Sequence, residues 1–184
     1  MRRRRTRARP ARTADPVLRT RPGTRSRGLL VAAGRTYPCA IGRSGAAGIK
    51  REGDGATPAG RWALRTVLYR ADRMRRPPTH APVRPIAPGD GWCDAPADRN
   101  YNRPVRHPYP ASAERLWRAD HLYDLVVVLG YNDRPRRRGR GSAIFMHLAR
   151  PDYAPTEGCV ALRRRDLERV LALLGRGATL IVRP

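Results

Sequence analysis

The 184-residue chain has no apolar run of the roughly 18 residues that a membrane-spanning helix needs. Its N-terminus also lacks the apolar core of a secretory signal peptide, because the run LLVAA at residues 29–33 is too short. The sequence therefore assigns no localisation. It is consistent with a cytoplasmic protein, with export by a route that leaves no signal here, or with a misassigned start codon.

Cysteine is scarce, and none of the three residues Cys39, Cys93 and Cys159 belongs to a CxxC pair. This argues against a zinc ribbon and against a thioredoxin-type redox motif. Cys39 falls on a predicted strand and is expected to pack in the core, whereas Cys93 could line a cleft. Cys159 could be a nucleophile, a buried apolar residue or a zinc ligand. The zinc alternative has no recognised ligand spacing; it would draw on Cys93, Cys159, His80, His107, His121 and His147.

Lysine is almost absent, since Lys50 is the only lysine among 39 basic residues. The net charge of +24 suggests a nucleic-acid or polyanion-binding module. However, residues 1–27 contain 11 arginines, one acidic residue and no aromatic side chain on which bases could stack. We expect residues 1–27 to form a disordered Arg-rich N-terminal arm whose contact with polyanions is a side effect.

The remaining residues, 28–184, are expected to form one domain of mainly β structure. Two short strands should flank a turn at Gly34, and alternating or continuous apolar runs predict strands at 63–70, 122–132, 142–149 and 178–182. One helix is predicted, with Asp166 as its N-cap and Gly175 at its end. Its apolar face comprises Leu167, Val170, Leu171 and Leu174.

Residues 70–118 contain nine of the 18 prolines and are predicted to form a long insertion. Long loops without secondary structure are uncommon in compact domains unless they are functional. The insertion therefore either walls a cleft or is a plain surface excursion, and the sequence does not decide between them.

A cysteine nucleophile needs a base, and His147 is the nearest candidate, near the end of the strand at 142–149. Alternation places Ala143, Phe145 and His147 on one face of that strand. His147 can take the thiol proton and later protonate a leaving group. Gly158 permits a tight turn before Cys159, and backbone N–H groups there could face an oxyanion.

The stretch MHLARPDYAPTEGCVAL resembles the active-site signature of the L,D-transpeptidases, the YkuD-like catalytic domain. The matching positions are His147, Thr156, Gly158, Cys159 and Val160. A second, upstream segment is similar to the family's Thr-Pro-x-Gly-aromatic motif; it comprises Thr57, Pro58, Gly60 and Trp62. The resemblance covers roughly residues 28–184.

The sequence departs from the family pattern at two positions. Glu157 stands where the family commonly has histidine, and Ala161 stands where it commonly has arginine, with Arg163 and Arg164 out of register. Glu157 beside a thiolate would raise the pKa of Cys159 unless its side chain points away or pairs with an arginine. These departures indicate a divergent branch of the family.

The resemblance implies a β-sandwich-like fold with one helix after the nucleophile, and a cysteine acyl-enzyme that uses no metal or organic cofactor. It further implies bacterial peptidoglycan stem peptides as substrates, a role in cell-wall biogenesis and cell shape, and a periplasmic or cell-wall location. Cys159 and His147 would be catalytic, and Gly158 would contribute to the oxyanion site. Thr156 is a supporting candidate that orients the loop or the imidazole, while Asp152 and Tyr153 either shape the rim or are merely solvated. The expected activity is transpeptidation, with L,D-carboxypeptidase activity or a non-catalytic Arg-rich binding module as alternatives.

Overall fold

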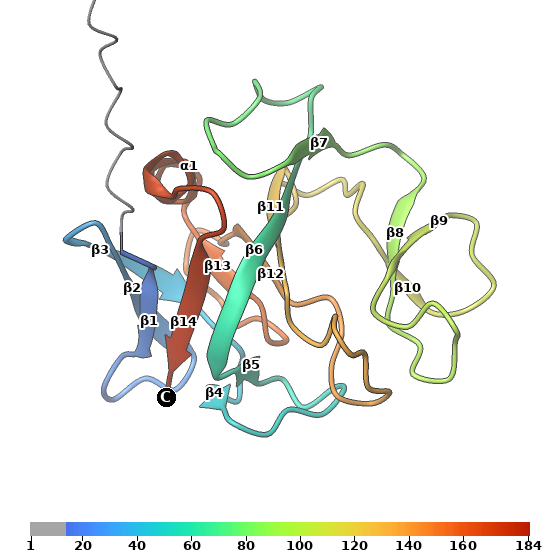
Figure 1. The fold of residues 1–184 in the computed structure, drawn as a ribbon, viewed down its shortest axis with the longest axis horizontal. Helices are drawn as coiled ribbons and strands as arrows, with labels where there is room; N and C mark the ends of the chain where they lie inside the picture. The colour runs from blue at the N-terminus through green and yellow to red at the C-terminus, as the bar shows by residue number, and fades with distance from the viewer. Residues whose placement is uncertain (1–13) are drawn as a thin grey trace, which may run out of the picture.

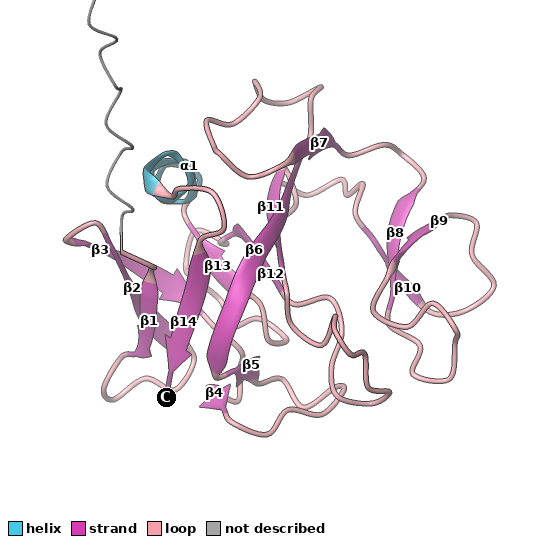
Figure 2. Cartoon of the chain, in the orientation of Figure 1, coloured by secondary structure: helices cyan, strands magenta, loops and turns pink. Residues whose placement is uncertain are grey.

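The computed structural model describes residues 14–184 and shows a mainly β domain, as expected (Figures 1 and 2). Within these residues the main sheet has nine strands, in the order β11-β12-β13-β3-β2-β1-β14-β6-β7. Their bounds are β1 Val17–Thr20, β2 Arg27–Ala32, β3 Arg35–Ala40, β6 Gly60–Tyr69, β7 Val83–Pro85, β11 Leu125–Leu129, β12 Phe145–Leu148, β13 Val160–Leu162 and β14 Thr179–Arg183. The strands predicted at 63–70, 122–132, 142–149 and 178–182 are thus confirmed with different ends: β11 and β12 are shorter, β6 begins three residues earlier, and β14 is shifted by one residue. None of the helices within residues 14–184 is long and apolar enough to cross a membrane.

The long strand β6 closes the main sheet on itself. Its first half pairs with β14, and its second half, from Leu64 to Tyr69, pairs with β11. The largest buried apolar cluster includes Leu30, Val127, Met146 and Leu180, which come from strands on opposite sides of this closed ladder. The continuous apolar run of β11 is buried at every position, as a doubly covered strand requires.

The hairpin predicted around Gly34 is confirmed. Strands β2 and β3 pair antiparallel up to Ala32 and Arg35, which leaves Ala33 and Gly34 as a two-residue turn. Both turn residues have positive φ, 47° and 74°. This is the conformation that lets a two-residue turn match the twist of its strands, and glycine adopts it at little cost.

The disordered arm predicted over residues 1–27 is wrong for its second half. Strand β1 pairs antiparallel with β2 and parallel with β14, and Leu18 is fully buried. Strand β1 has only four residues, one of which is Arg19, so its apolar content is too low to be recognised from composition. It is stabilised instead by hydrogen bonds to the two neighbouring strands, β2 and β14. Residues 1–13 lie outside the described residues, and no finding supports the polyanion contact expected of the arm.

Helix α1 spans Arg164–Leu173 and follows β13, as predicted, but Asp166 is not its N-cap. The N-cap is Arg163, whose carbonyl accepts bonds from the N–H groups of Asp166 and Leu167. Asp166 lies instead in the first turn, where the negative charge of its carboxylate interacts favourably with the helix dipole. The helix ends at Leu173, because Leu174 is already extended, so Gly175 does not close it. The predicted apolar face is buried.

The proline-rich insertion has secondary structure of its own. Besides β7 it contains a three-stranded sheet in the order β10-β8-β9, with bounds Asp90–Cys93 for β8, Pro104–Arg106 for β9 and Ala113–Arg115 for β10. This sheet lies to one side of the main sheet (Figure 1). A second buried cluster joins Ile86 and Leu116 of the insertion to Val126 and Phe145 of the main sheet. Packing against the domain therefore fixes the insertion in place. A two-stranded sheet, β4 Ala46–Ala47 with β5 Thr57–Pro58, completes the described elements.

Because Leu18 is fully buried, Leu18→Ala should lower the free energy of unfolding by about 3 kcal/mol. Chemical denaturation monitored by circular dichroism measures this change. The matched control is Val31→Ala on the neighbouring strand, which should have a small effect because Val31 is 39% exposed. Equal, small effects of the two substitutions would show that β1 is not part of the folded domain.

Candidate active site

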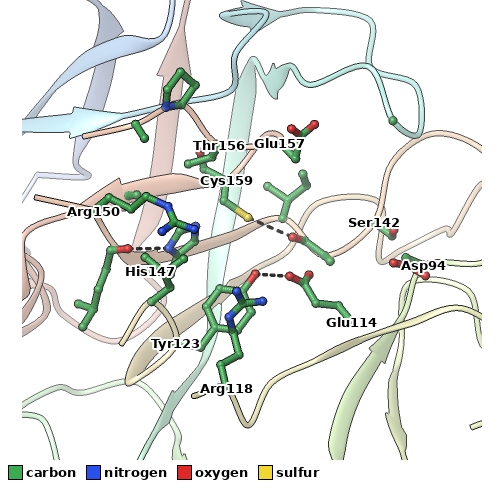
Figure 3. A pocket seen from close by; sticks show the side chains of 18 of the residues that line it. Asp94, Glu114, Arg118, Tyr123, Ser142, His147, Arg150, Thr156, Glu157 and Cys159 are labelled. Atoms are coloured by element: carbon green, nitrogen blue, oxygen red, sulfur yellow. Dashed lines mark hydrogen bonds between the residues drawn. The ribbon is translucent and has the colours of Figure 1, made fainter. Parts of the chain in front are cut away.

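One cavity of about 610 Å³ contains both residues expected to be catalytic (Figure 3). Its walls come from four parts of the chain: the upstream loop at Glu52 and Gly53, the proline-rich insertion with Glu114, strand β12 with His147, and the segment before Cys159. Of the two alternatives for residues 70–118, the structure therefore supports the insertion that walls a cleft.

Parallel pairing of β12 with β13 brings Cys159 and His147 together. The pairs Met146–Val160 and His147–Ala161 set the register, and Cys159 directly precedes β13. The Phe145 N–H donates to Cys159 Sγ at 3.3 Å, which places the thiol level with Phe145. Phe145 and His147 share one face of the strand, because side chains alternate along it. The imidazole and the thiol therefore face the same cavity one pleat apart.

A backbone carbonyl fixes the orientation of the His147 ring. Nδ1 lies 2.9 Å from the Leu148 carbonyl oxygen, which can only accept, so Nδ1 carries the proton. Nε2 is left with a lone pair that can accept a proton. The pKa of His147 is lowered to about 4, mainly by burial and to a smaller extent by the charges of Arg118 and Arg150. The imidazole is thus neutral at pH 7.

The Cys159 thiol is also neutral. Burial raises its pKa to about 12, and the negative charge of Glu114 adds to the rise, against a weaker lowering by the Phe145 N–H and by Lys50. The thiol donates to the Ala143 carbonyl oxygen at 3.2 Å (Figure 3). The resting pair is therefore thiol and imidazole, and the thiol must turn away from Ala143 before His147 can take its proton.

The loop before Cys159 is held by Thr156 and requires glycine at position 158. The Thr156 hydroxyl donates to the Cys159 carbonyl at 2.6 Å and accepts from the Gly158 N–H at 3.2 Å. Thr156 therefore orients the loop, whereas the imidazole is oriented by Leu148. Gly158 has φ 133°, and a Cβ there would lie 2.7 Å from the Ala56 carbonyl oxygen. Glycine is needed at position 158 because the backbone carbonyl of Ala56 approaches it closely. The Gly158 N–H is already bonded to the Thr156 hydroxyl within the loop.

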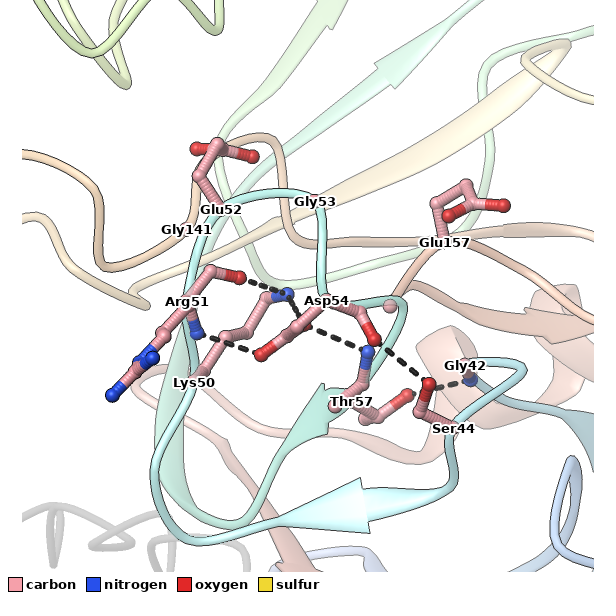
Figure 4. Close-up of polar contacts among 12 residues, drawn as sticks. Gly42, Ser44, Lys50, Arg51, Glu52, Gly53, Asp54, Thr57, Gly141 and Glu157 are labelled. Atoms are coloured by element: carbon pink, nitrogen blue, oxygen red, sulfur yellow. Dashed lines mark hydrogen bonds and ion pairs between the residues drawn. The ribbon is translucent and has the colours of Figure 1, made fainter.

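The upstream motif forms a platform beneath the cysteine loop. Gly42 forms a bridge with Thr156, and the Gly42 N–H donates to Thr57 Oγ1 at 2.8 Å (Figure 4). The Trp62 ring nitrogen donates to the Pro58 carbonyl at 2.8 Å. Segments more than 90 residues apart in sequence are thereby joined, which explains why the two motifs occur together.

Sequence reasoning missed Lys50, which lies in this platform. Its side chain is 2% exposed, and its Nζ donates to Asp54 Oδ1 at 2.6 Å and to the Arg51 carbonyl at 3.3 Å. Asp54 also accepts from the N–H groups of Arg51 and Ala56 (Figure 4). A Cβ on Gly158 would lie 3.4 Å from Nζ, so the ammonium group sits directly behind the cysteine loop. The sequence signal that could have indicated a special role for this residue is that Lys50 is the one lysine among 39 basic residues.

The sequence model of the L,D-transpeptidase catalytic domain matches residues 24–182. The chain belongs to this family. Members of the family are cysteine-nucleophile acyltransferases that act on peptidoglycan peptides. No curated protein and no solved structure matches the chain.

The two departures from the L,D-transpeptidase signature have different structural consequences. Glu157 forms an ion pair with Arg43, and its side chain is 74% exposed, so the negative charge acting on the thiol comes from Glu114 instead. Ala161 is buried on β13 opposite His147. Among the described residues that line the cavity, the cations are Arg118 and Arg150.

The remaining candidates lie away from the cavity that contains Cys159. Tyr153 lies between Arg27 and Arg163, whose guanidinium carbons are 5.5 and 5.3 Å from its ring centre. Asp152 is exposed, and its carbonyl accepts from Arg27. Cys39 and Cys93 are both buried thiols. Over residues 14–184, no three or more His, Cys, Asp or Glu side chains form a group that could hold a metal ion.

Because the pKa of Cys159 is raised to about 12, its alkylation by iodoacetamide should accelerate about tenfold per pH unit between pH 7 and 10, without a plateau. Peptide-level mass spectrometry separates Cys159 from the other two thiols. A plateau below pH 8 would show a thiolate–imidazolium pair in the resting site.

Lys50→Met should destabilise the protein by about 3 kcal/mol, since it leaves Asp54 without its cationic partner. Denaturant titration measures the loss. The control is Arg51→Met, which should be nearly neutral because Asp54 is bonded by the Arg51 backbone and not by its exposed side chain. Similar effects of both substitutions would contradict the buried ion pair.

Proposed function

We propose that the protein is a peptidoglycan L,D-transpeptidase that forms cross-links from stem tetrapeptides through a Cys159 thioester. The observation that carries this proposal is the placement of the Cys159 thiol and a neutral His147, with Nε2 free to accept a proton, in one cavity. Membership of the family supplies the reaction class.

In the first half-reaction, Cys159 Sγ attacks the carbonyl carbon between the third stem residue and the terminal D-alanine. His147 takes the thiol proton through Nε2 and delivers it to the departing amine of D-alanine. Because thiol and imidazole are both neutral at rest, proton transfer accompanies the attack instead of preceding it. Backbone donors at the Gly158–Cys159 turn stabilise the oxyanion, for which the Gly158 N–H must be released from Thr156 or shared with it.

In the second half-reaction, an amine attacks the thioester and forms the cross-link, while the thiolate leaves and recovers its proton. If water resolves the thioester instead, the protein is an L,D-carboxypeptidase that trims stems. Arg118 and Arg150 line the cavity and provide positive charge for stem carboxylates.

Intact-protein mass spectrometry with a disaccharide-tetrapeptide donor tests the proposal. We expect a mass increase equal to the donor minus D-alanine on the wild-type protein and none on Cys159→Ala, because the thioester needs this sulfur. A circular dichroism spectrum confirms that the variant is folded. Folded wild-type protein that forms no adduct and releases no D-alanine would refute the proposal and return attention to a binding module.

A further inference from the structure

Glu114 is a partly buried acid for which the reaction described above has no use. It belongs to β10 of the insertion, where it pairs with Trp92 of β8, and its side chain reaches the cavity opposite Cys159 (Figure 3). The Tyr123 hydroxyl donates to Glu114 Oε1 at 2.6 Å and fixes the carboxylate. Among residues 14–184, no arginine, lysine or histidine lies within ion-pair distance of Glu114. The charge of Arg118 acts on its pKa, but the Arg118 guanidinium is bound by Asp120 through two hydrogen bonds.

This placement works against the nucleophile. The charge of Glu114 raises the pKa of Cys159 and therefore disfavours the thiolate. Burial, with a contribution from Asp94, also raises the pKa of Glu114 itself. A carboxylate beside the thiol hinders formation of the thioester. We therefore expect the role of Glu114 to lie in the other half-reaction.

Asp94 provides an independent observation. It follows β8, lines the same cavity, and has a buried oxygen, Oδ1, with no hydrogen-bond partner among the described residues. A buried acceptor without a donor is costly, and a cationic donor would satisfy it. Glu114 and Asp94 together form one end of the cavity that is anionic in a protein of net charge +24. Arg150 lies beside His147, and Arg118 lies over the ring of Tyr123 (Figure 3).

We propose that Glu114 binds the acceptor amine and removes a proton from its ammonium form, with Asp94 as the second acceptor of that ammonium. The ligand class is a primary aliphatic amine, and the inference rests on the proposed transpeptidase function. One N–H proton passes to the Glu114 carboxylate, and the neutral amine then attacks the thioester carbonyl carbon. The C–N bond forms, the second proton passes to His147 Nε2, and the C–S bond breaks with its electron pair on Sγ. His147 then protonates Sγ, and Glu114 releases its proton to solvent.

The test uses a stem tetrapeptide with a side-chain primary amine as both donor and acceptor, and Glu114→Gln as the variant. The amide keeps an acceptor for the Tyr123 hydroxyl and removes the charge. The ratio of cross-linked to hydrolysed product should fall at least about tenfold, because general base catalysis of amine attack is lost. Thioester formation should be as fast as in the wild type or faster, since a negative charge near Sγ is gone.

Glu157→Gln is the matched control, because Glu157 is another glutamate at this cavity but is paired with Arg43. It should leave the product ratio within about twofold of the wild type. Asp94→Asn is the second variant. With a separate primary amine varied as acceptor at a fixed donor concentration, it should raise the KM for that amine with little change in kcat, as expected for loss of a binding contact. Thermal unfolding of each variant verifies the fold.

The outcomes separate the two proposals. A thioester that forms with an unchanged product ratio in both Glu114→Gln and Asp94→Asn would overturn the amine site alone. A fall in thioester formation equal to the fall in cross-linking would show that Glu114 only holds Tyr123 in place, which also overturns it. Wild-type protein that forms no thioester would remove the proposed function and this assignment with it.

Discussion

The contact between the Ala56 carbonyl and Gly158 is the constraint on which the site depends. It leaves no room for a side chain at position 158 and sets the turn that presents Cys159. The Gly42–Thr156 bridge joins the same two segments, and the Lys50–Asp54 pair braces the upstream loop that lies behind Gly158. The nucleophile is thus positioned by a platform that lies about 100 residues earlier in the chain, and the short loop after His147 needs little rigidity of its own.

The same packing explains why both members of the pair are neutral. Burial that orders the thiol and the imidazole also removes the water that would stabilise their charged forms. A neutral thiol is less prone to oxidation and alkylation than a thiolate. The resting thiol is therefore protected, and in the proposed reaction it leaves the Ala143 carbonyl to transfer its proton to His147.

The sequence predicted those parts of the fold in which a local pattern and the tertiary structure agree. The alternation in β12 correctly separated Met146 from Phe145 and His147, and the apolar face of α1 was correct although its cap was not. Strand β1 was missed because its stability comes from pairing with β2 and β14, which composition does not encode. The signature around Cys159 predicted Cys159 and His147 as site residues, and the structure places both in one cavity. Lys50 is marked in the sequence only by being the one lysine, and Glu114 only by its place in a proline-rich segment.

The insertion gives this domain a property that the signature motifs do not specify. Glu114 and Asp94 come from its small sheet, while Arg150 follows β12 of the main sheet, so the cavity has ends of opposite charge supplied by different parts of the chain. A ligand with a carboxylate and an ammonium group would be oriented by these ends before any contact with the thiol. The negative charge of Glu114 raises the pKa of Cys159, which disfavours the thiolate. In the proposed reaction this disadvantage is offset because the same charge binds the amine. In the proposed reaction, the nucleophile and the groups that select its acceptor therefore reside on separate elements of the fold, so that changes in the insertion would alter the acceptor without disturbing the platform beneath Cys159.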